Sequence, residues 1–102
     1  MSSSPTRECQ RIQAVLAQHL PELRERYAVA SLSLFGSYVR GDQRPGSDVD
    51  VLVTFSETPS LLEFIDLKLY LADLLGTEVD LVMASALKPH IGARILAEAV
   101  SV

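Results

Sequence analysis

Apolar residues recur with helical spacing near both ends of the chain, and this pattern predicts helices there. Ser4-Pro5 offers an N-cap followed by proline at the first helical position, and apolar residues then follow at helical spacing: Ile12, Val15, Leu16 and Leu20. Pro21 is expected to interrupt this helix and to open a second short one through Tyr27. A last helix is expected from about His90 to Ala99.

Three intervening runs have the character of strands: 29–35, 48–55 and 77–83. A short helical turn through Tyr38-Val39-Arg40 fits after the first. Ser60 and Glu63 have the spacing of a capping box and open a strongly apolar helix that ends at Gly76. Strands that alternate with helices predict an α/β (α+β) fold, in which helices pack on a small mixed sheet. An added edge strand near Ala99 to Val102 is left open.

The composition limits the classes of protein to which this chain can belong. The 102 residues, 48% hydrophobic and 22% charged, suit one soluble domain over 1–102, and no apolar stretch is long enough for a membrane span. The start lacks the layout of a secretory signal, and Cys9 is the single cysteine, so a reducing cytoplasm is expected. A net charge of −4 argues against direct nucleic-acid binding, which needs a clustered basic face.

Acidic residues interrupt the second and third predicted strands. Side chains alternate along a strand, so Val49, Val51 and Val53 share one face while Asp48 and Asp50 lie on the other. Two ionised carboxylates this close repel each other unless a cation lies between them, and oxygen ligands suit Mg²⁺. Asp80 lies in an otherwise apolar strand and would add a third carboxylate if the two strands are neighbours. Alternatively, each aspartate is a solvated residue on an open face.

A glycine and a hydroxyl residue, Gly36-Ser37, follow the first predicted strand. Backbone N–H groups at such a strand-to-helix turn attract phosphate. The alternative is a tight turn at Gly36 and a helix cap at Ser37. A phosphate-facing turn followed by a strand with two carboxylates is far more specific than either part.

The segments Leu34-Phe35-Gly36-Ser37-Tyr38-Val39-Arg40-Gly41 and Ser47-Asp48-Val49-Asp50-Val51-Leu52-Val53 resemble the signature of the DNA polymerase β-like nucleotidyltransferase superfamily. The compact length makes the chain similar to the minimal nucleotidyltransferases, which are antitoxin partners of HEPN-domain toxins. The resemblance runs from about Pro21 to Val102 and includes Asp80. Val39 stands where relatives often carry alanine.

This resemblance implies a nucleotidyltransferase fold and an enzyme that transfers AMP from Mg-ATP to a hydroxyl of the HEPN-type partner, a tyrosine in the family. ATP would place its triphosphate on Gly36 and Ser37, and Asp48, Asp50 and Asp80 would hold one or two Mg²⁺ ions and carry the catalysis. Arg40 would bear on phosphate, or form a plain salt bridge. One alternative is a non-catalytic antitoxin that masks its toxin. Transfer to a small molecule is disfavoured, because nothing in the 102 residues resembles a second domain that would close over such an acceptor, although a dimer could supply one.

The predicted helix from Ser60 to Gly76 is apolar nearly all round, and one buried face does not accommodate all of its leucines. We therefore expect part of it to form a protein interface, within a homo-oligomer or a hetero-oligomer.

Overall fold

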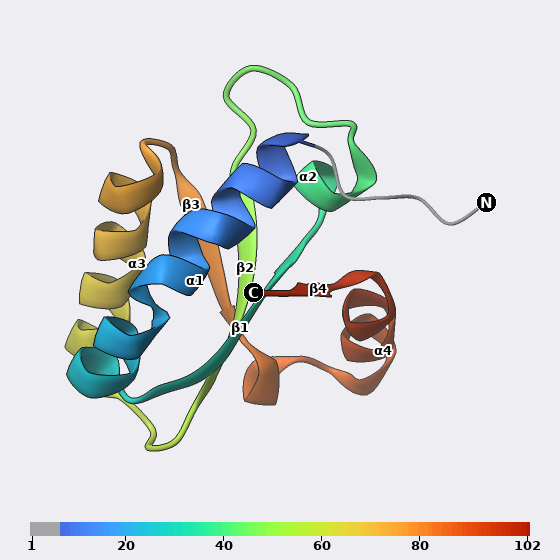
Figure 1. Cartoon of the computed structure of the whole chain (residues 1–102). Coiled ribbons are helices and arrows are strands. Elements are labelled where there is room, and N and C mark those ends of the chain that lie inside the picture. Colours follow the sequence, from blue (N-terminus) through green and yellow to red (C-terminus); the bar gives the residue numbers. More distant parts are fainter. Residues whose placement is uncertain (1–6) are drawn as a thin grey trace.

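A computed structural model describes residues 7–102, and helices flank its four-stranded sheet (Figure 1). The elements follow in the order α1 (Arg7–Tyr27), β1 (Val29–Phe35), α2 (Ser37–Arg40), β2 (Val49–Phe55), α3 (Leu61–Leu75), β3 (Val79–Met83), a 3₁₀ turn η1 (Ala84–Ala86), α4 (Pro89–Glu98) and β4 (Val100–Ser101). The predicted α/β class is confirmed. The helix cap expected at Ser4-Pro5 lies outside the described residues.

The sheet is mixed, with the strand order β3-β2-β1-β4. β1 pairs antiparallel with both β2 and β4, whereas β2 and β3 are parallel. The parallel pair is possible because α3 supplies the long crossover between its two strands. β4 settles the open question of an edge strand: Val100 pairs with Leu34, and Ser101 pairs with Ser33.

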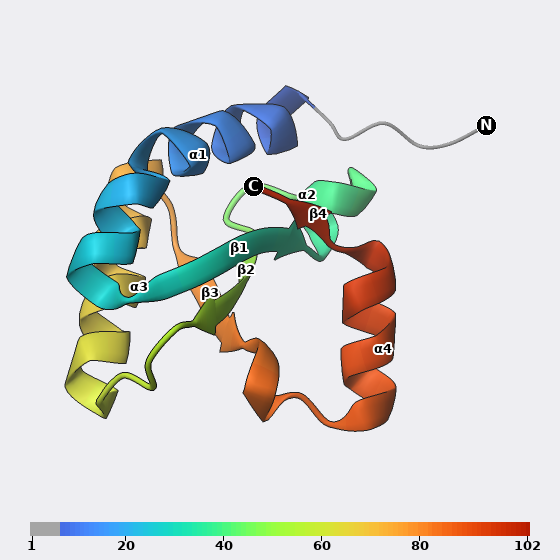
Figure 2. The ribbon, with the colours of Figure 1, turned by 60° about the horizontal axis from the view of Figure 1, so that its bottom comes forward.

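One face of the sheet carries the core. The valines of β2, Val49, Val51 and Val53, are fully buried as their alternation predicts. α1 and α3 lie together on one side of the sheet, and α4 stands at the opposite side of the molecule from α3 (Figure 2). Among residues 7–102, no helix combines the length and the apolar character needed to cross a bilayer.

The predicted break at Pro21 is wrong, because α1 continues through it to Tyr27. Buried residues occur on both sides of the proline and keep one helical phase, namely Ile12, Leu16, Leu23 and Tyr27. Packing of this single stripe against the core outweighs the hydrogen bond that proline removes from the helix.

The capping box of α3 is confirmed. The Glu63 N–H donates to Ser60 Oγ (3.2 Å), and the Ser60 N–H donates to Glu63 Oε1 (2.9 Å). Gly76 ends the helix in the left-handed conformation with φ 69°. Leu67, Leu71 and Leu75 are buried, whereas four large apolar side chains of α3 are exposed: Leu61, Leu62, Ile65 and Leu69.

Candidate active site

The three predicted carboxylates come from the start of two neighbouring strands. Asp50 of β2 is the register partner of Asp80 of β3. Asp48 directly precedes β2, which begins one residue later than predicted, at Val49. The parallel pairing of β2 with β3 therefore brings together residues that are thirty positions apart in the chain, as the sequence analysis expected.

The surroundings of Asp50 raise the pKa of its carboxyl group. Its side chain is half-buried, whereas Asp48 and Asp80 are exposed. Burial, the charge of Asp80, a hydrogen bond with Asp80 and the charge of Asp48 together raise the pKa of Asp50 to about 6, and Arg40 opposes this only weakly. A hydrogen bond between two carboxyl groups needs a proton, so this contact favours the protonated form of Asp50 unless a cation takes the place of the proton.

The turn at Gly36 lies directly against Asp50. Gly36 follows Phe35, the last residue of β1, which is the register partner of Asp50. Its backbone has φ 80°, and a Cβ built there would lie 2.0 Å from Asp50 Oδ2. Only glycine therefore allows this approach of the turn to the carboxylate.

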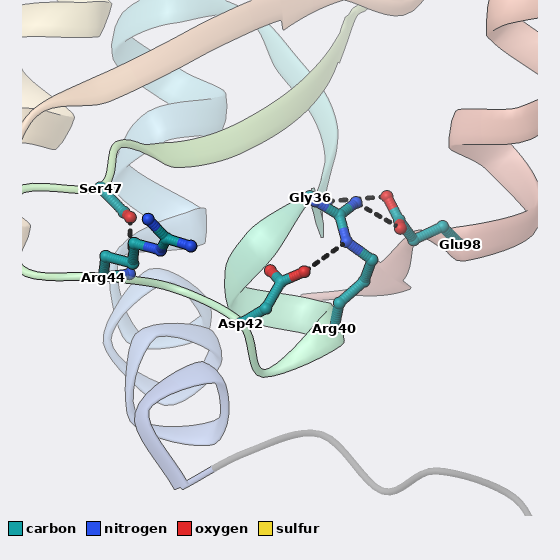
Figure 3. A network of polar contacts seen from close by, with 6 residues as sticks. All are labelled: Gly36, Arg40, Asp42, Arg44, Ser47 and Glu98. Carbon is teal, nitrogen blue, oxygen red and sulfur yellow. Dashed lines mark hydrogen bonds and ion pairs between the residues drawn. The ribbon is translucent and has the colours of Figure 1, made fainter.

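Ser37 and Arg40 are the first and last residues of the short helix α2. Arg40 lies between two carboxylates: its Nε donates to Asp42 Oδ2 (3.3 Å), and its Nη1 donates to Glu98 Oε1 (2.8 Å). Glu98 Oε2 also accepts the backbone N–H of Gly36 at 2.9 Å. Figure 3 shows that one carboxylate from α4 thus joins the Gly36 turn to Arg40.

These contacts determine the pKa of the Glu98 carboxyl group. Partial burial raises its pKa, but the hydrogen bonds from Arg40 and from the Gly36 N–H outweigh burial, so the pKa lies below the usual value for glutamate. Glu98 is therefore a charged acceptor at neutral pH.

A pocket of about 340 Å³ opens where α4 faces the turn and Asp50. Half of its lining comes from α4, which the sequence analysis did not assign to the site: Ile91, Arg94, Ile95 and Glu98. Their spacing, i, i+3, i+4 and i+7, places them on one helical stripe that mixes isoleucine with charged residues. This spacing was the available signal, but only the fold shows that the stripe faces Gly36 and Asp50.

The three aspartates are better suited to hold Mg²⁺ together with a nucleotide than to surround a metal ion with protein ligands alone. Within residues 7–102, no three His, Cys, Asp or Glu side chains are arranged as a cluster that could by itself hold a metal ion. Mg²⁺, however, typically keeps several waters and takes one or two carboxylates together with substrate phosphates. Burial and the repulsion by Asp80 together raise the pKa of Asp50, and such a cation would relieve the repulsion.

The sequence of this chain matches the nucleotidyltransferase domain model over residues 16–102, so the chain belongs to this family of nucleotidyltransferases. A protein adenylyltransferase MntA of Thermococcus cleftensis is 54% identical over 91 residues, which cover 89% of this chain and 92% of that relative. The resemblance noted in the sequence is thereby confirmed.

Solved structures agree with this assignment. One assigned as a minimal nucleotidyltransferase superposes with a TM-score of 0.72 at 39% identity, covering 91% of this chain and 90% of that one. A chain from a toxin-antitoxin crystal structure with AMP-PNP superposes with a TM-score of 0.68 at 25% identity, covering 94% of this chain and 72% of that one.

Proposed function

We propose that residues 1–102 form a single minimal nucleotidyltransferase domain that acts in the cytoplasm as an antitoxin. It transfers AMP from Mg-ATP to a hydroxyl group, a tyrosine by the family resemblance, of a HEPN-domain toxin and so neutralises it. The observation that carries this proposal is the convergence of Asp50 and Asp80 beside the Gly36 turn. The 54% identity to a protein adenylyltransferase supports the reaction, and the similarity to a toxin-antitoxin structure with AMP-PNP supports the nucleotide and the partner class.

The Gly36-Ser37 turn would bind the triphosphate. Its close approach to Asp50 would place the phosphates next to the carboxylates, because no side chain at Gly36 intervenes. The pocket beside it offers the apolar side chains Ile91 and Ile95 and the positive charge of Arg94 to the rest of the nucleotide. Such a mixture of apolar walls and a few polar groups is typical of small-molecule sites.

Asp48, Asp50 and Asp80 would hold one or two Mg²⁺ ions. Bound there, Mg²⁺ would supply charge neutralisation for the attacking oxygen and the departing pyrophosphate. In the reaction, the acceptor oxygen bonds to the α-phosphorus while the bond to pyrophosphate breaks. Asp80, which is exposed where Asp50 is half-buried, is the carboxylate that would receive the hydroxyl proton.

The decisive experiment measures the intact mass of a candidate HEPN-domain partner after incubation with this protein, ATP and Mg²⁺. The expected result is a gain of one or more adenylyl units. The control is the Asp48→Asn/Asp50→Asn variant, which keeps the side-chain shape but loses both charges, and it should give no gain. A modified peptide located by mass spectrometry would then identify the acceptor residue.

The alternative, neutralisation by masking alone, is suggested by the exposed leucines of α3. It needs neither ATP nor the aspartates. A stable complex that silences the toxin without any mass gain, and equally well with the Asp48→Asn/Asp50→Asn variant, would favour masking and contradict AMP transfer.

A further inference from the structure

Glu98 is a residue of α4 that hydrogen-bonds to the Gly36-Ser37 turn, through the Gly36 N–H. Gly92 is the buried residue of this helix, whereas Ile91 and Leu96 are more than half exposed. The helix therefore contributes little to the hydrophobic core. Its last residue, Glu98, nevertheless makes two hydrogen bonds to groups sixty-two and fifty-eight positions earlier in the chain, at Gly36 and Arg40.

Backbone hydrogen bonds within the turn hold the Gly36 carbonyl, which accepts the N–H groups of Val39 and Arg40 at 3.1 Å each, but they leave the Gly36 N–H to Glu98. α2 is four residues long, and the Gly36 side of it has no side-chain cap. Gly36 is buried, and its N–H points to Glu98 Oε2 at 2.9 Å. A buried N–H without an acceptor is unfavourable, so removal of this carboxylate should favour other conformations of the turn.

We propose that Glu98 is a positioning residue for the nucleotide site. It holds the Gly36 N–H and the Arg40 guanidinium in one arrangement, so that the turn presents Ser37 and its backbone to the triphosphate beside Asp50. This inference rests on the proposed function and assigns a role in it to α4. Glu98 acts through Gly36 and Arg40 and does not itself touch the reacting atoms.

The geometry distinguishes this role from that of an ordinary surface ion pair. Arg40 is about half exposed, with 52% of its side chain accessible, and Asp42 pairs with it from the solvent side at 3.3 Å. Exposed pairs of this kind contribute little to stability. Glu98 differs because 26% of its side chain is accessible and because it also binds the backbone of the turn. Asp42 is therefore a matched control: it shares Arg40 but does not contact Gly36.

The test compares Glu98→Gln, Glu98→Ala and Asp42→Asn with the wild-type chain. Calorimetric binding of Mg-ATP and of magnesium tripolyphosphate, which has no base, should weaken about tenfold in Glu98→Ala, an effect that corresponds to about 1.4 kcal/mol. Glu98→Gln should lose less, since its amide oxygen still accepts the Gly36 N–H. Asp42→Asn should stay within about twofold. In the transfer assay the loss should appear mainly in KM for ATP rather than in kcat.

The amide resonance of Gly36 gives an independent reading. In ¹⁵N-labelled protein, Glu98→Ala should shift this resonance strongly, and Asp42→Asn should leave it near its wild-type position. Thermal unfolding of each variant shows whether it folds.

Four results would overturn the proposal. Unchanged binding in folded Glu98→Ala would reduce Glu98 to a surface ion pair, and tighter binding would mean that its carboxylate competes with phosphate. Binding lost equally in Asp42→Asn would assign the effect to Arg40 alone. Wild-type protein that binds ATP without transferring AMP would contradict the proposed function but leave the Glu98 comparison intact, whereas wild-type protein that binds no ATP would contradict both.

Discussion

Asp50 and Asp80 face each other as register partners on the only parallel pair of strands within residues 7–102, β2 and β3. Burial of Asp50 first, and then the neighbouring charge of Asp80, raise the pKa of Asp50 to about 6. Two carboxylates kept this close cost stability in the absence of a cation. The fold therefore maintains an unfavourable contact at the place where the family resemblance puts the metal.

Asp80→Asn tests whether this contact serves catalysis. We expect AMP transfer to fall by on the order of 100-fold or more, because the asparagine neither accepts the acceptor proton nor offers a charged ligand. Rates should be measured by the mass gain of the partner, with unfolding curves to show that the variant folds. Glu25→Gln, at an exposed glutamate of α1, is the matched control and should keep the wild-type rate. A normal rate in Asp80→Asn would remove Asp80 from the mechanism.

Asp50→Asn should stabilise the metal-free protein at neutral pH. The pKa of Asp50 in the folded state, about 6, exceeds its usual value of 3.8. Its contribution to stability is thus fully present below pH 3.8 and is lost as the pH rises through 6. The asparagine should add about 1–2 kcal/mol to the free energy of unfolding at pH 8. The gain is smaller than the full pKa shift implies, because the half-buried carboxylate keeps part of its hydration.

This difference is measured by urea denaturation in EDTA at pH 4 and pH 8. The two proteins should differ more at pH 8 than at pH 4, and added Mg²⁺ should stabilise only the wild-type chain. Equal stability at pH 8 would show that the Asp50 carboxylate is not strained by its neighbours.

Gly36→Ala should damage the site beyond the cost of backbone strain. Gly36 and Gly46 have similar positive φ angles, 80° and 85°, but a Cβ at Gly46 meets nothing within 4 Å. Gly46→Ala should therefore cost about 1–2 kcal/mol of stability for the left-handed conformation alone. Gly36→Ala should cost more and should also abolish transfer, because its methyl group displaces Asp50. Similar losses of stability and activity in both variants would contradict this.

The exposed side chains of α3 are expected to contact a protein partner. With 3.6 residues per turn, Leu61, Leu62, Ile65 and Leu69 fall within an arc of about 100°. Leu62 and Leu69 are 79% and 61% exposed, so Leu62→Glu/Leu69→Glu should leave the unfolding temperature nearly unchanged. Binding to the HEPN-domain partner should weaken at least tenfold in titration calorimetry. Gln18→Glu/Gln10→Glu on α1 is a control with the same added charge, and equal binding by both double variants would place the interface elsewhere.

Local patterns were sufficient to predict most elements and the catalytic candidates. The alternation of Val49, Val51 and Val53 identified a half-buried strand, and the Ser60–Glu63 box marked the start of α3. Asp80 stood out because an aspartate is unfavourable in an apolar strand unless a neighbour requires it. These inferences worked because they depend on residues within a few positions of one another.

Tertiary packing decided what local patterns do not contain. Pro21 stays inside α1 because buried side chains on both of its sides share one helical stripe, a property of the core rather than of the proline. Glu98 enters the site because β4 pairs with β1 and brings the end of α4 to Gly36. The sequence by itself therefore determined most of the elements and the candidate carboxylates. The partners of the Gly36 turn lie some sixty residues away in the chain, and the free energy of such contacts arises only when the chain is folded.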